Sequence, residues 1–328
     1  MTGTAMEPAD RVDPRSAVRL LPTDPGVYRF RDERDRVLYI GRAVNLRRRA
    51  GSYWGKLSGR PRLRRMVPQI ARVEALVCAS EHEAAWVERN LLEQRLPRWN
   101  RARGGQEVPV YIRIDPRPAK PRLDVVHSVL DADGVRHFGP YLGGLKVRLA
   151  ASALQRVLPL AYTGNGLRGF GRDLARIRGV DPTDRDTLTA TVAAVLDRQP
   201  AALDWIRAEL LSRRDSASES LAFELAARLQ DEAAAIEWVV AEQKAASMVP
   251  THAEVCAWAG GSLVAFDIRD GYLRTWTHVT CAAEAATART AATPERWTTF
   301  AVRNAALAAR LAGDGDPAPD QSLVATRR

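Results

Sequence analysis

The chain has 328 residues and a mass of 36.2 kDa, enough for about two domains that each bury a core. A hydrophobic content of 46% argues against disorder, and the chain lacks both a run of about eighteen apolar residues and a signal-type apolar core, so we expect a cytoplasmic protein. The net charge of +10 favours an acidic partner, and three scattered cysteines indicate neither a disulfide framework nor a cysteine metal site.

The amino-terminal third of the chain is predicted to form one compact α/β module. Residues 1–17 are polar and irregular, as in a flexible arm, and two short strands follow at residues 25–31 and 36–41. The polar residues 32–35 between these strands are typical of a hairpin loop. The module therefore opens with a β-hairpin.

The two strands of this hairpin carry mirror-image motifs, Gly26-Val27-Tyr28 and Tyr39-Ile40-Gly41. We predict that Tyr28 pairs with Tyr39, which also sets Gly26 opposite Gly41. Because strand side chains alternate between faces, both tyrosines then lie on one face of the sheet. Glycine beside each tyrosine would leave that face open to a ligand.

Capping patterns and an alternating apolar run complete the module. Asn45 is a candidate N-cap for a basic helix. Apolar residues alternate within residues 71–79, which predicts a third strand. Ser80 and Glu83 then form a predicted capping box for a helix over residues 81–96. The expected order is β-β-α-α-β-α.

The positive charge is concentrated in one window of this module. Between Arg42 and Arg72 the chain has ten lysines and arginines and no acidic residue. Neutralising phosphates is the commonest use of such a field, and a solvated basic surface is the alternative. The candidate contacts to a nucleic-acid backbone are Arg47, Arg48, Lys56, Arg60, Arg62, Arg64 and Arg65.

One carboxylate stands out on the helix predicted over residues 81–96. Glu88 lies between Ala84 and Leu92 at a spacing of one helical turn, inside the apolar face. A carboxylate in that position is costly unless it is paired or bound to a cation. A buried Glu–Arg ion pair is one interpretation, and a Mg²⁺ site that keeps several waters is the other.

The tyrosines suggest proton transfer. Tyr28 and Tyr39 would present two hydroxyl groups on one face, and nearby arginines with a hydrated cation would lower a phenol pKa enough for one phenolate to take a proton from water. Arg49 could bind a phosphate, and Tyr53 lies four residues further along the same helix. The alternative is that these tyrosines are ordinary core or sheet aromatics.

Residues 21–100 resemble the UvrC-like branch of the GIY-YIG nuclease family, in an ordered set of motifs. The matching segments are Gly26-Val27-Tyr28, Tyr39-Ile40-Gly41, Arg42 to Arg49, Ser52-Tyr53-Trp54, Glu88 to Leu92, and Pro97-Arg98-Trp99-Asn100. The resemblance implies an α/β fold in which a small antiparallel sheet is flanked by helices. A mostly helical region with a helical hairpin and a small α+β carboxy-terminal segment would follow.

The resemblance also implies roles for single residues. Tyr39 would be the general base, Arg49 the phosphate ligand and Glu88 the ligand of Mg²⁺ or Mn²⁺. Arg42 stands where the family usually has lysine, which preserves the charge but changes its geometry. The full set of catalytic candidates is Tyr28, Tyr39, Arg42, Arg49, Tyr53 and Asn100.

Beyond the nuclease module, residues 111–114 and 123–126 predict two strands. Phe138-Gly139-Pro140-Tyr141 resembles a family turn and predicts a sharp turn before a helix over residues 145–158.

The expected division of the chain is a flexible arm at 1–17, the nuclease domain at 18–102, a UvrC-type extension at 103–160, a cysteine-free helical connector at 161–214, a UVR helical hairpin at 215–248, a carboxy-terminal α+β segment at 249–312 and a disordered tail at 313–328.

Two further properties follow from the resemblance. The connector has no cysteine where the family has a four-cysteine cluster, so we predict no iron–sulfur cluster. The segment from Phe223 to Glu232 resembles the UVR motif, which implies a UvrB-like partner, although an ordinary antiparallel helix pair is the alternative. The candidate partner contacts are Phe223, Glu224, Ala227 and Arg228.

The resemblance therefore implies a metal-dependent DNA endonuclease of nucleotide excision repair. The second nuclease domain of the family is missing, so the chain is similar to the short Cho type that cuts only on the 3′ side of damage. Its expected partners are damaged duplex DNA and a UvrB-like protein, and its expected location is the nucleoid. A non-catalytic adaptor with a decayed site, and a nuclease for RNA or branched DNA, are the alternatives.

Overall fold

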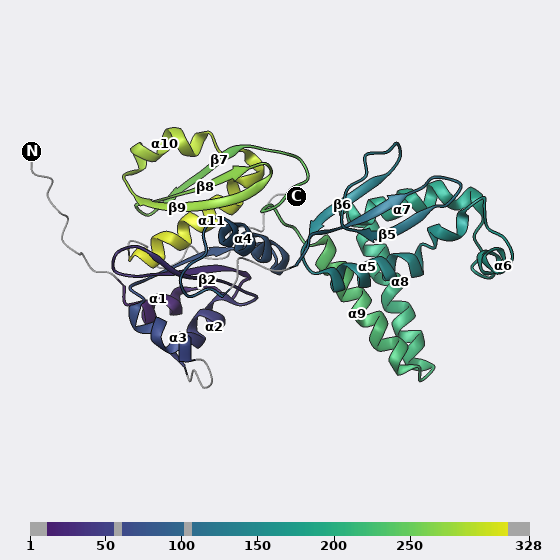
Figure 1. Cartoon of the computed structure of the whole chain (residues 1–328), viewed down its shortest axis with the longest axis horizontal. Helices are drawn as coiled ribbons and strands as arrows, with labels where there is room; N and C mark the ends of the chain where they lie inside the picture. The colour runs from purple at the N-terminus through teal and green to yellow at the C-terminus, as the bar shows by residue number, and fades with distance from the viewer. Residues whose placement is uncertain (1–11, 56–60, 102–106, 314–328) are drawn as a thin grey trace, which may run out of the picture. The chain divides into compact units, whose positions relative to one another are not determined.

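The computed structural model describes residues 12–55, 61–101 and 107–313 (Figure 1). The chain divides into two compact units, one made of Met1–Gly105 with Gln243–Arg328 and the other of Gln106–Glu242. Most of the predicted arm, Lys56, Arg60 and the predicted tail beyond residue 313 lie outside the described residues. The part of the arm that is described contains a helix, α1 (Pro14–Leu20), which Asp13 caps by accepting from Ser16 N at 3.0 Å.

The sheet of the first unit has the antiparallel order β2-β1-β3, with β1 at Gly26–Arg31, β2 at Val37–Ala43 and β3 at Arg72–Val77. Our predicted register was wrong by two residues, because Tyr28 lies opposite Gly41 and Phe30 lies opposite Tyr39. Both registers place the tyrosines on one face, and that part of the prediction is confirmed by a distance of 6.2 Å between the ring centroids of Tyr28 and Tyr39.

The glycines of the two motifs do not leave an open face, as we had expected. A Cβ atom at Gly41 would lie 2.5 Å from the hydroxyl of Tyr28, so the Tyr28 ring fills that space. A Cβ atom at Gly26 would collide with the carbonyl oxygen of Leu76 on β3. Both glycines therefore permit close packing of the sheet.

The helices of this module begin where the capping residues predict. Asn45 caps α2 (Leu46–Gly51) by accepting from Arg48 N at 2.8 Å, and a 3₁₀ turn at Ser52–Trp54 follows. Ser80 caps α4 (Glu81–Gln94) by accepting from Glu83 N at 3.0 Å. A short helix, α3, spans Pro61–Met66, and a second 3₁₀ turn spans Val67–Gln69.

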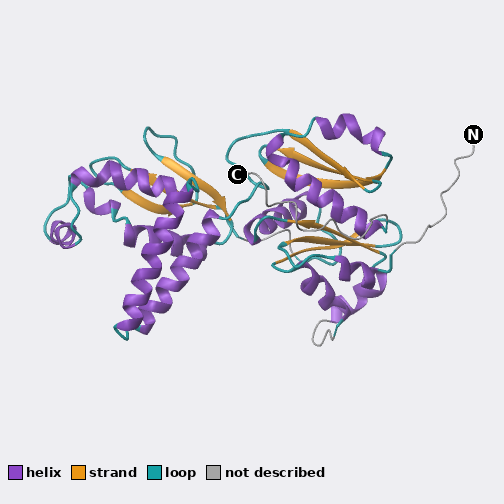
Figure 2. Ribbon diagram, turned by 180° about the vertical axis from the view of Figure 1, so that it is seen from behind, coloured by secondary structure: helices purple, strands orange, loops and turns teal. Residues whose placement is uncertain are grey.

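The carboxy-terminal segment packs onto this module within the same unit. It contains the antiparallel sheet β7-β8-β9 (Ala253–Ala259, Ser262–Arg269 and Tyr272–Thr280), followed by α10 (Ala283–Ala291) and α11 (Glu295–Ala312). Helices α4 and α11 contact strands of both sheets and lie between them (Figures 1 and 2). The nuclease module therefore shares its helical layer with the carboxy-terminal segment.

The second unit combines a small sheet with helices. Its strands are β4 (Val110–Asp115), β5 (Arg122–Val126) and β6 (Arg136–Tyr141), in the order β5-β4-β6. The turn predicted at residues 138–141 is wrong, because these residues form part of the edge strand β6. The helices are α5 (Gly144–Val157), α6 (Phe170–Ile177), α7 (Arg185–Leu196), α8 (Pro200–Glu219) and α9 (Phe223–Val240), with 3₁₀ turns at Leu160–Thr163 and Pro182–Asp184.

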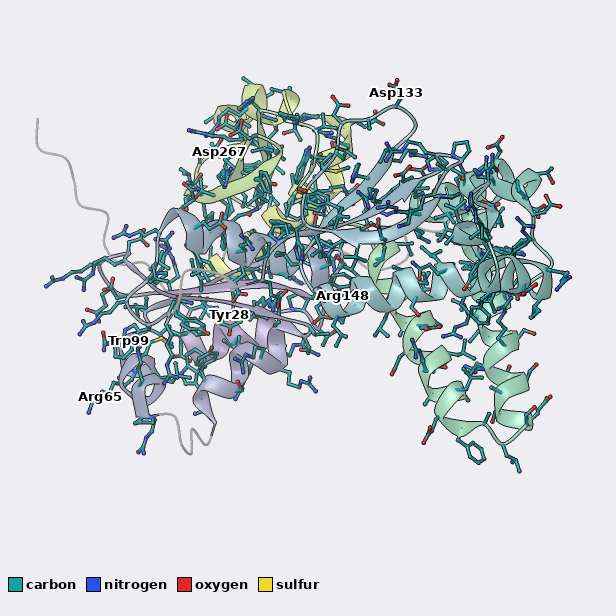
Figure 3. The ribbon with its side chains drawn as sticks, turned by 45° about the vertical axis from the view of Figure 1, so that its right-hand side comes forward. Tyr28, Arg65, Trp99, Asp133, Arg148 and Asp267 are labelled. Carbon is teal, nitrogen blue, oxygen red and sulfur yellow. The ribbon has the colours of Figure 1, made fainter. Side chains whose placement is uncertain are left out.

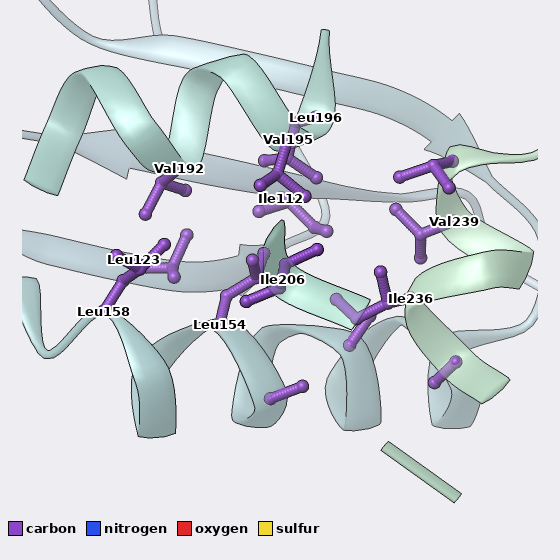
Figure 4. Packing of buried hydrophobic residues seen from close by; sticks show 14 of the residues in the cluster. Ile112, Leu123, Leu154, Leu158, Val192, Val195, Leu196, Ile206, Ile236 and Val239 are labelled. Atoms are coloured by element: carbon purple, nitrogen blue, oxygen red, sulfur yellow. The ribbon is translucent and has the colours of Figure 1, made fainter. Parts of the chain in front are cut away.

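The core of the second unit lies between its sheet and its helices. Figure 4 shows Ile112 of β4 and Leu123 of β5 packed near Leu154 of α5, and all three side chains are buried. Helices α8 and α9 pack against each other as a helical hairpin, and both contact α5. This hairpin projects its turn away from the core, which leaves the turn residues in solvent.

Candidate functional site

Three tyrosine rings form the centre of the candidate site. The hydroxyls of Tyr28 on β1 and Tyr53 in the 3₁₀ turn lie 2.8 Å apart, and the ring centroids of Tyr39 and Tyr53 lie 5.7 Å apart. Tyr28 and Tyr53 are 0% and 2% exposed, whereas Tyr39 on β2 is partly exposed. Water therefore reaches Tyr39 more readily than the other two.

Burial gives two of these tyrosines a different proton affinity from an exposed phenol. It raises the pKa of Tyr28 and the pKa of Tyr53 well above their ordinary value. Arg49 and the hydrogen bond from Tyr53 lower the pKa of Tyr28, but they do not offset the burial. Burial therefore decides the direction of the shift at Tyr28, although Arg49 lowers the pKa as we expected of a nearby arginine, and both buried hydroxyls stay protonated at neutral pH.

The arginines of α2 differ in what they contact. The guanidinium of Arg49 is partly exposed and lies 5.8 Å from the ring centroid of Tyr53, on the border of the tyrosine cluster. Arg47 donates from Nε to the carbonyl oxygen of Leu21 at 2.7 Å, and Arg48 is exposed. Of the three, Arg49 is the cation beside the tyrosines.

Glu88 is partly buried, whereas we expected it within the buried face of the helix. Its side chain on α4 is 22% exposed, because α4 turns this position toward the rim of β2. Its carboxylate accepts from the backbone N–H of Arg42 at 3.1 Å, and the Arg42 guanidinium lies 3.4 Å away. The structure thus shows a Glu–Arg ion pair, one of our two interpretations, at a partly buried position.

The chemistry of this position still fits a hard divalent cation. A single accessible carboxylate, with waters and a substrate phosphate as the other ligands, is an ordinary Mg²⁺ site. Within the described ranges, no cluster of three or more His, Cys, Asp or Glu side chains is arranged to hold a metal. Glu88 would therefore be the protein's ligand for such an ion.

Asn100 connects the closing motif to β2. Its Nδ2 donates to the carbonyl oxygen of Ile40 at 2.8 Å, and its Oδ1 accepts from Ile40 N at 3.0 Å. Trp99 N adds a bond to the carbonyl oxygen of Leu38 at 3.1 Å. The turn at residues 97–100 therefore pairs with the outer edge of β2 next to Tyr39, and the Asn100 side chain contacts the backbone there.

The basic residues of α3 form a separate surface. Arg64 and Arg65 are exposed, and Arg62 is partly exposed and donates to the carbonyl oxygen of Arg98 at 2.6 Å. Arg98 was quoted within a motif in the sequence but was not assigned a role. Its signal was its place between Pro97 and Trp99, two residues before Asn100.

The α8–α9 hairpin exposes apolar side chains at its turn. Phe223 is 64% exposed, and its neighbours Leu221 and Leu225 are 73% and 43% exposed. Arg228, by contrast, pairs with the buried Glu232 at 3.2 Å within the same helix. Glu224 and Ala227 are exposed on the first turns of α9.

No helix in the described part of the chain combines the length and apolar character needed to cross a bilayer. All three cysteines are free thiols, and Cys78 and Cys256 are buried.

Comparisons with known proteins identify the module. Residues 24–101 match the family described as the UvrC-like GIY-YIG domain. The chain is 31% identical to UvrABC system protein C of Corynebacterium aurimucosum over 81% of its own length and 41% of the relative's. It is 34% identical to UvrABC system protein C of Mycolicibacterium vanbaalenii over 79% of its own length and 41% of the relative's.

A solved structure has a similar domain. The amino-terminal GIY-YIG endonuclease domain of UvrC from Thermotoga maritima, bound to its catalytic divalent cation magnesium, is 31% identical. The match covers 26% of this chain and 94% of that domain, with a TM-score of 0.25, and no structural inference rests on it.

Residues 24–101 thus match a UvrC-like GIY-YIG domain, and the longer stretch around them is similar to UvrABC system protein C. The chain spans about two fifths of the length of the curated relatives that it matches.

Proposed function

We propose that this chain is a metal-dependent DNA endonuclease of nucleotide excision repair. The observation that carries the proposal is the grouping of Tyr28, Tyr39 and Tyr53 with Arg49 beside them. An ordinary aromatic core has no reason to place three phenols and a partly exposed guanidinium together at a sheet face. A phosphodiesterase needs a proton acceptor and a cation in that arrangement.

Tyr39 is the proposed general base. It is the accessible phenol of the three, and its phenolate form would accept a proton from the attacking water and become the neutral phenol. The neutral hydroxyls of Tyr28 and Tyr53 would orient that phenol by hydrogen bonding. Their raised pKa values keep them as donors at neutral pH.

Arg49 and Glu88 would act on the phosphate. The Arg49 guanidinium would bind the scissile phosphate and the charge that develops on it. Glu88 would hold Mg²⁺ or Mn²⁺, which supplies Lewis-acid stabilisation of the phosphate oxygens when bound. Arg42 would move its guanidinium away from the Glu88 carboxylate to make room for the cation.

The finer parts of the proposal concern where and with whom the chain acts. The incision would fall on the 3′ side of a lesion, in the nucleoid of the cytoplasm. The exposed apolar turn at Leu221, Phe223 and Leu225 would bind a UvrB-like protein. The basic surface of α2 and α3 would track the DNA backbone without reading bases.

One observation favours a second function. Arg42 already neutralises the carboxylate of Glu88, so a chain that had lost its metal would keep a stable, paired site. In that case the protein would be a DNA- and UvrB-binding adaptor without catalysis.

Cleavage of matched substrates separates these functions. Purified protein with Mg²⁺ would be given lesion-bearing, branched and intact duplexes, each with and without a UvrB protein, and the nick would be mapped on a sequencing gel. The endonuclease proposal expects a Mg²⁺-dependent nick on the 3′ side of the lesion. Binding of DNA and UvrB without any nick would support the adaptor, and preference for the branched or intact duplex would contradict a role in repair.

A further inference from the structure

A basic pocket lies beside the turn at residues 97–100, on the first unit. It has a volume of about 600 Å³ and no carboxylate among the described residues that line it. Its lining residues are Pro61, Arg62, Arg65, Gln69, Arg98 and Trp99. Three of these carry guanidinium groups, so the pocket concentrates positive charge in a concave surface.

The three arginines are not equivalent. Arg62 is held in place, because it donates to the carbonyl oxygen of Arg98 at 2.6 Å and its guanidinium lies 5.9 Å from the ring centroid of Trp99. Arg65 and Arg98 are exposed, and neither forms an ion pair with a carboxylate in the described part of the chain. Figure 3 shows Arg65 and Trp99 at the same end of the unit. Arg65 and Arg98 are therefore available to an anion.

Trp99 gives the pocket a rigid wall. Its side chain is only 9% exposed, and the Arg98 guanidinium lies 5.5 Å from its ring centroid. An aromatic ring under a guanidinium restrains the cation without neutralising it. The pocket is thus a preorganised set of donors and not a loose group of surface side chains.

We propose that this pocket binds a backbone phosphate of DNA other than the phosphate that is cut. The inference rests on the proposed nuclease function. Guanidinium groups match phosphate oxygens in geometry and charge, and phosphate contacts fix the register of a protein on a duplex. Arg98 and Trp99 thereby gain a role in positioning DNA.

The pocket is joined to the candidate base through the turn. Arg62 also reaches the carbonyl oxygen of Asn100 at 3.5 Å, and the Asn100 side chain makes two hydrogen bonds to Ile40. Ile40 directly follows Tyr39 in β2. A strand anchored in the pocket is therefore held at a fixed offset from Tyr39, and that offset selects the linkage that is cut.

Neutral-backbone scanning tests this proposal. Duplexes that carry a single methylphosphonate linkage, moved one position at a time, would be bound and nicked by the wild type and by the double variant Arg65→Gln, Arg98→Gln. Arg34→Gln is the matched control, because it removes an exposed arginine from the hairpin loop of the same unit. Thermal unfolding of each variant would show that the fold is intact.

The proposal expects one sensitive linkage, apart from the nicked one, where the methylphosphonate weakens wild-type binding about tenfold. The double variant should bind unmodified DNA about tenfold more weakly. The slope of its log affinity against log salt concentration should be smaller by about one to two, and the methylphosphonate at the sensitive linkage should no longer weaken its binding. Arg34→Gln should keep it.

Unchanged sensitivity in the double variant would overturn the pocket while leaving the nuclease in place, provided that the wild type nicks. A wild type that neither binds nor nicks DNA would overturn the nuclease proposal and the pocket together.

Discussion

At the scale of single residues, the candidate site is defined by unequal burial of three phenols. Tyr28 and Tyr53 share a hydrogen bond inside the module, while Tyr39 meets solvent. Burial keeps the first two neutral, so they can orient a neighbour but not accept a proton from water. The proposed division of roles follows from this difference.

Replacing each phenol by phenylalanine should separate the two roles. Tyr39→Phe should fold normally and slow nicking by about 10²- to 10⁴-fold, the usual contribution of a general base. Tyr53→Phe should instead lower the free energy of unfolding by about 1 kcal/mol, because it breaks the buried bond to Tyr28. Single-turnover nicking and urea unfolding measure the two effects, and equal rates for Tyr39→Phe and the wild type would exclude Tyr39 as the base.

The sequence predicted the members of this site better than its geometry. The period of two in a strand was sufficient to place Tyr28 and Tyr39 on one face, even in a register that was wrong by two residues. It could not show that the Tyr28 ring fills the space over Gly41, since that contact depends on the true register. Glu88 was predicted to be buried because its helical neighbours are apolar, but the position of α4 against β2 decides its exposure.

At the scale of elements, one side chain of α11 hydrogen-bonds the backbone of the edge strand β3. Asn304 is 1% exposed, and its Oδ1 accepts from Val77 N at 2.7 Å while its Nδ2 donates to Val77 O at 3.1 Å. These bonds satisfy backbone groups that β3, as an edge strand, would otherwise bury without partners.

Removing that side chain should loosen the attachment. Asn304→Ala should lower the free energy of unfolding by about 2 to 4 kcal/mol, because two buried backbone groups lose their partners. Val302→Ala, on an exposed position of the same helix, should change it by less than about 0.5 kcal/mol. Urea denaturation of both variants tests this, and similar values for the two would show that the Asn304 bonds contribute little.

A buried charge cluster joins the same strands to the carboxy-terminal sheet. Glu74 on β3 pairs with Arg29, and the guanidinium of Arg29 stacks on the Trp276 ring of β9 at 3.7 Å. Burial by itself would raise the pKa of Glu74, but Arg29, Arg31 and Arg72 lower it from 4.5 to about 2. The ionised carboxylate is therefore favoured by folding.

This shift predicts a loss of stability in acid. Because the folded-state pKa is the lower one, the stabilisation is complete above about pH 4.5 and is lost as the pH falls toward 2, by up to about 3 kcal/mol. Glu74→Gln should be less stable at neutral pH and lose most of this acid dependence, whereas Asp267→Asn should keep it. Thermal unfolding between pH 2 and 7 measures this dependence. If stability changed equally with pH in Glu74→Gln and in the wild type, the assignment to Glu74 would be contradicted.

Strand and helix positions were largely predictable, but the packing of distant elements was not. Alternation and caps located β1, β2, β3 and α4 because those signals are local. Residues 138–141 were predicted as a turn from Gly139-Pro140, yet β6 is an edge strand, where proline costs no ladder bond. The bonds from α11 to β3 join residues 227 positions apart, and no local pattern reports them.

At the scale of the whole molecule, the two proposed activities belong to different units. The candidate nuclease site belongs to the unit formed by both ends of the chain, and the helical hairpin belongs to the unit between them. Leu221, Phe223 and Leu225 are exposed at the hairpin turn, where much of their apolar surface is in solvent. A partner surface is the physical use for such an apolar group.

Changing the turn should therefore affect binding to a partner alone. Phe223→Ser should reduce UvrB binding by at least about tenfold, since an apolar anchor is lost, while the unfolding temperature and UvrB-independent DNA affinity stay unchanged. Leu145→Ser, at an exposed apolar position of α5, is the control. Pull-down with purified UvrB measures the effect, and full retention by Phe223→Ser would exclude the hairpin turn as the docking site.

The central claim is that Glu88 serves a divalent cation in a working nuclease site. The most direct measurement compares the wild type with Glu88→Gln, scoring both DNA affinity and Mg²⁺-dependent nicking of a lesion-bearing duplex. We expect Glu88→Gln to bind DNA with nearly unchanged affinity and to show no detectable nicking. The amide keeps the shape of the side chain but loses the charge that binds the metal. Wild-type nicking that survives in Glu88→Gln would contradict it.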